Sequence, residues 1–270
     1  MKYWLRQALL TLLAVGCIAI CISGCKSGEG QNPAPENDMT QSDTGADTTP
    51  LTDAEKDRKP SDPGTQEEKT EEERIESVYR NGAEETMCIF TSGGNNGTGF
   101  VYEEKYVITN AHVLYDADEF TLRDVKGREY DGTVVFSDDN TDIAIIQVDD
   151  YHGRSVTLGN SDTVSVGEQV VLIGNPADGD LFTLRTGKRL EPIEELRPLP
   201  FHGISYIALD ADISSGFSGG SVFNLRGELI GISHAKFSGD LTAYKLDSLS
   251  FVIPINSVKE QIELNIPAQF

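Results

Sequence analysis

The ten residues from Ser215 to Asn224 constrain this chain more than any other segment, because they require a tight turn around one serine. They read Ser-Gly-Phe-Ser-Gly-Gly-Ser-Val-Phe-Asn. Glycine permits backbone conformations that a side chain would obstruct. Such a turn can aim the Ser218 hydroxyl and the N–H groups of Gly216 and Ser218 into one pocket. Two converging N–H groups stabilise the negative oxygen that develops when an acyl group is attacked. The segment therefore predicts a nucleophilic serine with an oxyanion hole, if a base and an acid lie elsewhere in the chain.

A candidate base follows a predicted β-hairpin. Residues 97–102 and 106–114 alternate apolar and β-branched residues around a short polar loop. His112 comes directly after the second strand, where the end of a sheet can hold an imidazole that exchanges protons near neutral pH. The alternative for a lone histidine is a core or surface role. His152 and His202 lie beside glycines in loop-like sequence, and no pair of histidines has metal-ligand spacing, so the sequence predicts no metal site.

A candidate acid stands at the mouth of a strongly apolar strand. Asp142 directly precedes residues 143–148, which read Ile-Ala-Ile-Ile-Gln-Val. A carboxylate buried there needs a partner, because an unpaired buried charge is costly. A histidine N–H is a suitable partner, since the acid fixes the imidazole tautomer and stabilises the imidazolium. The alternative is an aspartate that only forms a turn, which is how we interpret Asp138 and Asp139.

The chain order His112, Asp142, Ser218 is that of the chymotrypsin arrangement, not of subtilisin or the α/β-hydrolases. Together with further segments, it makes residues 75–258 resemble the protease domain of the HtrA/DegP family of trypsin-like serine proteases. The segments that carry this resemblance are Gly-Thr-Gly-Phe (97–100), Thr-Asn-Ala-His-Val (109–113), Gly-Arg-Glu-Tyr (127–130), Thr-Asp-Ile-Ala (141–144), Val-Gly-Glu-Gln-Val-Val-Leu-Ile-Gly-Asn-Pro (166–176), Gly-Phe-Ser-Gly-Gly (216–220), Gly-Glu-Leu-Ile-Gly-Ile (227–232) and Phe-Val-Ile-Pro-Ile-Asn-Ser-Val (251–258). The resemblance implies an all-β fold of two six-stranded antiparallel β-barrels, over residues 75–155 and 156–270, with the active site in the cleft between them.

The chain departs from the family pattern around the nucleophile. Phe217 stands where the family has asparagine, and Ser221 stands where it has proline. Both flank the oxyanion turn. A phenylalanine also cannot bind a newly cut N-terminal ammonium, so we expect no activation by N-terminal trimming. We further expect no PDZ domain. A homotrimer, usual in the family, stays open because the region that would form it, residues 75–83, is divergent.

The resemblance implies several possible substrate preferences. Asp212, six residues before the nucleophile, falls at the base of the substrate pocket in this fold, where an aspartate selects Lys or Arg. His234 lies one residue from the place where glutamyl endopeptidases keep a pocket histidine. Typical HtrA proteases have neither residue and prefer small aliphatic side chains, which is our first choice. An extended substrate would add as a strand beside Ser233 to Ala235.

The first 24 residues are typical of an export signal. Lys2 and Arg6 precede an apolar run that continues to Ile22. The sequence Ile-Ser-Gly-Cys at 22–25 resembles a bacterial lipobox. We therefore predict a lipoprotein signal peptide over residues 1–24, lipid attachment at Cys25, and anchoring at the extracytoplasmic face of the cell membrane. The alternatives are an uncleaved signal anchor and a plain secretory peptide.

Residues 25–74 differ from the rest of the chain in composition. They are rich in Pro, Gly, Ser, Thr, Gln and acidic residues, with very few large apolar ones. Such a segment cannot bury enough surface to offset its chain entropy. We predict a disordered acidic tether, with a short helix that starts near Thr65 and runs through Ile75 and Val78 into the folded part.

Charge and cysteine content narrow the possible partners. The chain has 44 acidic and 22 basic residues, a formal net charge of −22. This argues against binding to nucleic acid, whose phosphates favour a basic face. Anionic lipid headgroups are repelled as well, so a lipid anchor must hold the protein at the membrane. Cys88 is the one cysteine outside the predicted signal and anchor, so no internal disulfide forms, and a buried apolar role is the better interpretation.

The sequence as a whole favours a serine endopeptidase that hydrolyses unfolded or exported polypeptides at the outer face of the cell membrane. No cofactor is needed for this chemistry. The first alternative is a protease fold that binds peptides without cutting them. A glutamyl-endopeptidase-like enzyme and a purely structural surface lipoprotein are further alternatives.

Overall fold

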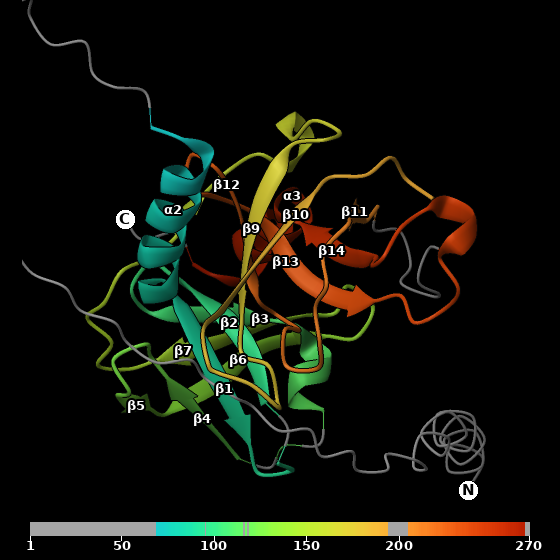
Figure 1. Ribbon diagram of the computed structural model, residues 1–270. Coiled ribbons are helices and arrows are strands. Elements are labelled where there is room, and N and C mark those ends of the chain that lie inside the picture. Colours follow the sequence, from blue (N-terminus) through green and yellow to red (C-terminus); the bar gives the residue numbers. More distant parts are fainter. Residues whose placement is uncertain (1–68, 95, 116, 118, 194–204, 268–270) are drawn as a thin grey trace, which may run out of the picture. The chain divides into compact units, whose positions relative to one another are not determined.

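The computed structural model describes residues 69–94, 96–115, 117, 119–193 and 205–267. The predicted signal peptide, Cys25, most of the tether and His202 lie outside these residues. The described part contains two β-sheets, one from each half of the folded chain (Figure 1). None of its helices is long and apolar enough to cross a membrane.

The first sheet comes entirely from residues 86–148 and is antiparallel throughout. Its spatial order is β5-β4-β1-β2-β3-β7-β6. The strands are β1 (Thr86–Thr91), β2 (Asn96–Tyr102), β3 (Tyr106–Thr109), β4 (Phe120–Arg123), β5 (Glu129–Tyr130), β6 (Gly132–Asp138) and β7 (Ile143–Val148). The predicted hairpin is present, because β2 and β3 pair from Phe100 with Ile108 to Tyr102 with Tyr106.

The second sheet has the order β10-β9-β12-β13-β14-β11, with β8 paired to β13 outside this path. The strands are β8 (Thr157–Leu158), β9 (Gln169–Gly174), β10 (Thr183–Lys188), β11 (Ile207–Leu209), β12 (Ser221–Asn224), β13 (Glu228–Lys236) and β14 (Ser250–Pro254). The predicted all-β, chymotrypsin-like class is confirmed. Each sheet has seven described strands instead of the expected six, because the two-residue strands β5 and β8 join the sheets, and β8 runs parallel to β13.

In the part of the chain that the structure describes, two α-helices and three short 3-10 helices accompany the sheets. Helix α2 (Glu71–Glu84) begins at Glu71 because Thr70 caps it: the Glu73 N–H donates to Thr70 Oγ1, and the Glu73 carboxylate accepts from the Thr70 N–H. The helix thus starts later than predicted, and its Val78 is buried. The remaining helices are η2 (Ala111–Leu114), η3 (Ser161–Thr163), η5 (Thr242–Tyr244) and α3 (Ile255–Asn265).

The burial of strand β7 explains why Asp142 directly precedes an apolar run. Ile143 and Ile145 join a core cluster shared with the second sheet, whereas Ile146 and Val148 join a separate cluster inside the first sheet. Alternate side chains of a strand point to opposite faces, so β7 is buried on both. Burial on both faces accounts for its almost uninterrupted apolar sequence and fixes the position of the residue before it, Asp142.

Candidate functional site

The predicted base and acid meet at adjacent ends of two paired strands. His112 lies on η2 directly after β3, and Asp142 lies directly before β7. The Nδ1 of His112 is 2.8 Å from Asp142 Oδ2 and 3.0 Å from Oδ1. The backbone N–H of His112 also donates to Oδ1, at 2.9 Å. Asp142 is fully buried, whereas the His112 side chain is 34% exposed and so can reach a substrate.

The Asp142 carboxylate is held in its ionised form. Burial alone would raise its pKa, but the hydrogen bonds from His112 and the close approach of the His234 ring outweigh burial and lower the pKa below the ordinary value. Asp142 also has a left-handed backbone with φ +52°, which aspartate tolerates better than most residues. An ionised acid at this place favours the tautomer of His112 that carries its proton on Nδ1.

The serine turn leaves two of its N–H groups unused. Within the described residues, no hydrogen bond involves the N–H of Gly216 or of Ser218, whereas those of Phe217, Gly219 and Gly220 all donate to backbone carbonyls. The two unused groups are the two that the sequence predicts to form the oxyanion hole. They alternate with a used one, which is the pattern that a turn around an anion-binding pocket requires.

The two peptides that flank Gly216 are each fixed in orientation by a hydrogen bond. The Ser215 carbonyl accepts a hydrogen bond from the Ala177 N–H at 3.0 Å. The Gly216 carbonyl accepts one from Thr98 Oγ1 at 2.8 Å. Because a trans peptide points its C=O and N–H in opposite directions, the Gly216 N–H points away from Ala177. Gly216 needs to be glycine here: its φ is +95°, and a Cβ would lie 2.2 Å from the Asn175 carbonyl oxygen.

Base and nucleophile line the same open pocket. The pocket holds about 270 Å³ and is lined by Thr91, Asn96, His112, Val113, Tyr115, Ser215, Gly216 and Ser218. The Ser218 hydroxyl donates to the His234 carbonyl at 3.4 Å, and within the described residues it makes no hydrogen bond to His112. Hydrogen bonds between nucleophile and base are often long in a protease without substrate and tighten when substrate binds. The three predicted residues are therefore gathered at one site, with the serine not yet engaged by the base.

Phe217, the departure from the family pattern, faces the core. Its side chain is fully buried within a cluster of the second sheet that includes Val170 and Leu172. The ring lies so close to Gly174 that a Cβ there would come within 2.3 Å of it. The phenylalanine thus packs under the turn, and its backbone N–H donates to Ser214.

Asn110 is a residue of the site that sequence reasoning missed. It is fully buried and bridges the two sheets: its Nδ2 donates to the Asp142 carbonyl at 3.0 Å, and its Oδ1 accepts from the Gly219 N–H at 2.7 Å. The acid and the nucleophile turn are thereby tied to one side chain. Asn110 belongs to the segment 109–113, which helped to carry the family resemblance. Its role could not be predicted from that segment, because its hydrogen-bond partners are distant in the sequence.

His234 lies against the acid. Its side chain is only 4% exposed, and its Nδ1 is 2.9 Å from Asp142 Oδ2. The ring is turned off the ideal hydrogen-bond direction, yet this separation puts it in direct contact with the carboxylate. His112, Asp142 and His234 offer ligand atoms within 4.8 Å of one another, so the set could also hold a metal ion. Sequence spacing does not reveal this cluster, because the three residues are far apart in the chain.

The other two predicted pocket residues have different surroundings. Asp212 is exposed, and its carboxylate forms an ion pair with Lys236 at the end of β13. Ser233 is buried, and its backbone supports the nucleophile turn: its N–H donates to Gly220 and its carbonyl accepts from Gly219. The carboxylate of Asp212 therefore already lies against a cation of the chain itself.

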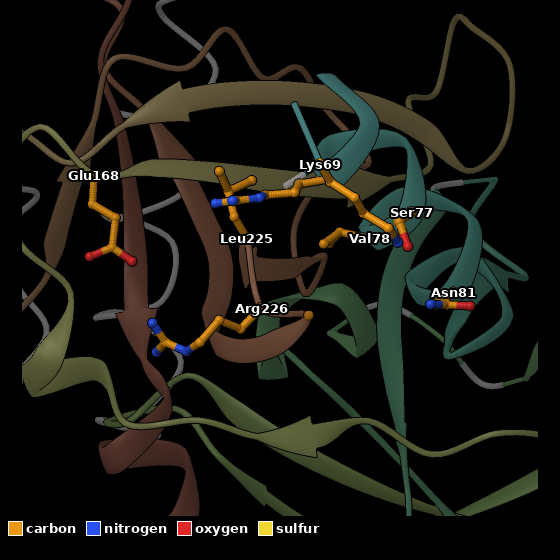
Figure 2. A pocket seen from close by; sticks show the side chains of 9 residues that line it. Lys69, Ser77, Val78, Asn81, Glu168, Leu225 and Arg226 are labelled. Atoms are coloured by element: carbon orange, nitrogen blue, oxygen red, sulfur yellow. The ribbon is translucent and has the colours of Figure 1, made fainter. Parts of the chain in front are cut away.

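A second pocket lies beside helix α2 (Figure 2). It is lined by Lys69, Arg74, Ser77, Val78, Asn81, Glu168, Leu225, Arg226 and Gly227. Leu225 to Gly227 connect β12 to β13, so this pocket lies between the helix and that turn. None of its residues belongs to the candidate active site, and we do not assign peptide hydrolysis to it.

Comparison with known families and proteins supports the same site. The family model described as "Trypsin-like peptidase domain" matches residues 97–232, which is half of the chain. A protein of Halomonas elongata, designated a "probable periplasmic serine endoprotease DegP-like", is 37% identical over 163 residues. A protein of Rhizobium meliloti with the same designation is 34% identical over 172 residues. The matches cover 59% and 62% of this chain but only 33% and 32% of those relatives.

Solved structures agree with these matches. The HtrA-type protease AlgW with a tripeptide aligns with a TM-score of 0.61 at 28% identity, over 70% of this chain and 62% of that one. The serine endoprotease from Yersinia pestis aligns with a TM-score of 0.60 at 25% identity, over 71% of this chain and 66% of that one. By contrast, the chain spans about a third of the length of the curated relatives it matches.

Proposed function

Because the chain belongs to the family of trypsin-like peptidase domains and is HtrA/DegP-like within it, we propose that it is a serine endopeptidase. The observation that carries this proposal is the pair of unused N–H groups, of Gly216 and Ser218, in a pocket lined by His112. A turn that only packs against the core pairs its donors within the protein, whereas acyl transfer requires two donors that face the substrate pocket.

The geometry supports the following mechanism. The Ser218 hydroxyl attacks the carbonyl carbon of the scissile peptide bond while Nε2 of His112 accepts its proton. Asp142, bonded to Nδ1, orients the imidazole and stabilises the imidazolium that forms. The negative oxygen of the tetrahedral intermediate binds to the N–H groups of Gly216 and Ser218. His112 then gives its proton to the leaving amine, and water hydrolyses the acyl-enzyme by the same steps.

We extend the proposal to substrate and location. The substrates are unfolded or exported polypeptides, and the enzyme acts outside the cytoplasm, held at the outer face of the cell membrane by a lipid on Cys25. Two findings support this: the export-signal and lipobox-like pattern of residues 1–25, and the periplasmic designation of the relatives. Globomycin, which blocks lipoprotein signal cleavage, tests the anchor. We expect a larger precursor to accumulate, and Cys25→Ser to release the chain from membranes.

Labelling with a fluorophosphonate tests the proposed chemistry. We expect the wild-type chain to be labelled at Ser218, and Ser218→Ala to lose the label. His112→Ala should slow labelling strongly, because the serine then lacks its base. The resting contact of Ser218 with the His234 carbonyl favours a second candidate, a module that binds peptides without cleaving them. Binding of peptides to a wild-type chain that is never labelled or cleaved would establish that candidate instead.

A peptide-library digest tests the substrate preference. We expect cleavage after small aliphatic residues, because the Asp212 carboxylate is paired with Lys236 and so is a poor partner for a substrate Lys or Arg. Cleavage mainly after basic residues would contradict this choice, and cleavage after acidic residues would favour the glutamyl-endopeptidase-like alternative.

A further inference from the structure

We infer that Lys236 is a specificity-determining residue of this active site, whose pairing with Asp212 disfavours substrate side chains of either charge beside the scissile bond. The ion pair joins the end of β13 to the segment that leads into the nucleophile turn, residues 212–217. It therefore connects two parts of the chain that both reach Ser218. This role deepens the proposed function and rests on it.

The two halves of a substrate extend from Ser218 in different directions. The leaving amine takes its proton from His112, so it must enter the pocket that His112 and Ser218 line. Among the described residues, none of β13 lines that pocket. The Ser218 hydroxyl meets β13 elsewhere, at the His234 carbonyl, over 3.4 Å. We therefore expect the acyl half of the substrate to extend on that side, along the end of β13.

Two contacts join the end of β13 to the nucleophile turn and to the segment before it. The first is the bond from the Ser218 hydroxyl to the His234 carbonyl, and the second is the bond from the Lys236 ammonium to the Asp212 carboxylate. The substrate residue whose carbonyl is attacked is held at the first contact, two residues along β13 from the second. Two residues of a strand span roughly 6.6 Å. A long side chain at this substrate position therefore reaches the ion pair, whereas a small one does not.

The ion pair carries the charges of this part of the surface. Residues 212–217 and 234–236 contain no other charged side chain than Asp212 and Lys236, apart from His234, whose ring lies against the buried acid. The side chains of Asp212 and Lys236 are 70% and 42% exposed. A substrate side chain can therefore contact either partner, and its own charge decides whether it competes with the pair.

The pair acts on the choice of substrate more than on the fold, because an exposed ion pair adds little to stability. A substrate lysine or arginine binds Asp212 only if it displaces Lys236, and the two cations repel each other. An acidic substrate side chain binds Lys236 only if it displaces Asp212, and the two carboxylates repel each other. An uncharged side chain leaves the pair intact. Lys236 thus contributes to specificity by disfavouring the competing substrates.

Two single variants and their combination isolate the two charges. Lys236→Met keeps a long side chain without the charge, and Asp212→Asn keeps the shape of the aspartate without its charge. The probe peptides have the sequence that the library digest selects and differ only in the residue whose carbonyl is attacked, which is Ala, Lys or Glu. For each protein, kcat/KM on the Lys and Glu peptides is divided by kcat/KM on the Ala peptide.

We expect Lys236→Met to raise the Lys-to-Ala ratio about tenfold, because the Asp212 carboxylate then gains one charged hydrogen bond to the substrate. Asp212→Asn should raise the Glu-to-Ala ratio about tenfold, because the Lys236 ammonium is then available to an acidic side chain. The combined variant has neither charge and should show neither gain. Sodium chloride at about 1 M should reduce both gains, since it screens exposed charges.

A Lys-to-Ala ratio that stays at the wild-type value in Lys236→Met overturns this role. Equal gains on the Lys and Glu peptides in one variant overturn it as well, because they would result from lost bulk and not from lost charge. If Lys236→Met does not fold, as judged by its thermal transition, Lys236→Gln replaces it with the same expected result. Fluorophosphonate labelling of the wild type keeps the two proposals apart: an unlabelled wild type refutes the peptidase itself, whereas a labelled wild type with unmoved ratios in the variants refutes only the role of Lys236.

Discussion

Thr98 offers the sharpest test of how the oxyanion hole is held. Its Oγ1 donates to the Gly216 carbonyl at 2.8 Å and accepts from the Asn175 N–H at 3.0 Å. The Asn175 side chain also donates to it, at 3.2 Å. Thr98 is fully buried, so no water replaces these partners. Valine has the same shape without the hydroxyl, and Thr98→Val therefore removes the three bonds with little change in packing.

The magnitude follows from the groups that lose their partner. The Gly216 carbonyl and the Asn175 N–H are left buried without a hydrogen bond, at about 1–3 kcal/mol each, so the variant should be about 2–6 kcal/mol less stable. For a folded part of this size, 2 kcal/mol lowers Tm by roughly 4–8 °C. Gly216, whose N–H is a proposed oxyanion donor, also loses the bond that holds the peptide on its carbonyl side. Because loss of an oxyanion donor costs ~10²–10³ in kcat, a loosened donor should cost up to ~10².

The assay compares Thr98→Val with Thr98→Ser, which keeps the hydroxyl and serves as the matched control. Calorimetry gives Tm, and hydrolysis of a peptide ester gives kcat and KM, measured at a temperature where both variants are folded. We expect the loss in kcat to be confined to the valine variant, with KM nearly unchanged, because the oxyanion forms only in the transition state. A folded valine variant with wild-type kcat would refute the view that Thr98, through the Gly216 carbonyl, helps to hold the Gly216 N–H in place.

Three further predictions concern the Asp142 carboxylate, the Cys88 thiol and the cluster around Asp142. The pKa of Asp142 is lowered on folding, so its ionisation stabilises the fold above about pH 4, and this contribution is lost as pH falls through the lower pKa of the folded state. The difference in Tm between wild type and Asp142→Asn should therefore shrink below about pH 4. A difference that stays constant with pH would contradict this prediction. Burial raises the pKa of the Cys88 thiol to about 12, so iodoacetamide at pH 8 should leave the native chain unmodified and active, as mass spectrometry would reveal. EDTA should leave the initial rate unchanged; a loss of activity that Zn²⁺ restores would mean that the cluster at His112, Asp142 and His234 needs a metal ion.

The sequence predicted those features that depend on local pattern. Alternating residues identified the hairpin that leads to His112, and the continuous apolar run of β7 identified the buried strand that Asp142 precedes. The glycines around Ser218 identified the turn. Because the ends of strands are rigid and each candidate directly adjoins a strand or its turn, chain order and family resemblance were enough to predict that the three would meet.

The residues that hold these groups could not be predicted in the same way. Asn110 and Thr98 bond partners 109 and 118 residues away in the chain, and nothing local indicates such a contact. His234 depends on the register shift in β13, which re-aims one side chain and leaves no mark in the sequence. The number of strands in each sheet also differed from the expected six. A two-residue strand such as β5 has too few residues to show an alternating pattern in the sequence.

Phe217 connects these two kinds of residue. The sequence marked it as unusual beside the nucleophile, but its ring fills the core of the second sheet, close against Gly174. Its backbone N–H donates to Ser214, and its carbonyl accepts from Gly220, so the residue between the two oxyanion donors is fixed by packing and by hydrogen bonds. A side chain anchored in this way needs no newly cut N-terminus to order the turn. We therefore expect the mature chain to react with fluorophosphonate without further trimming, and a chain that is labelled only after N-terminal cleavage would contradict this account.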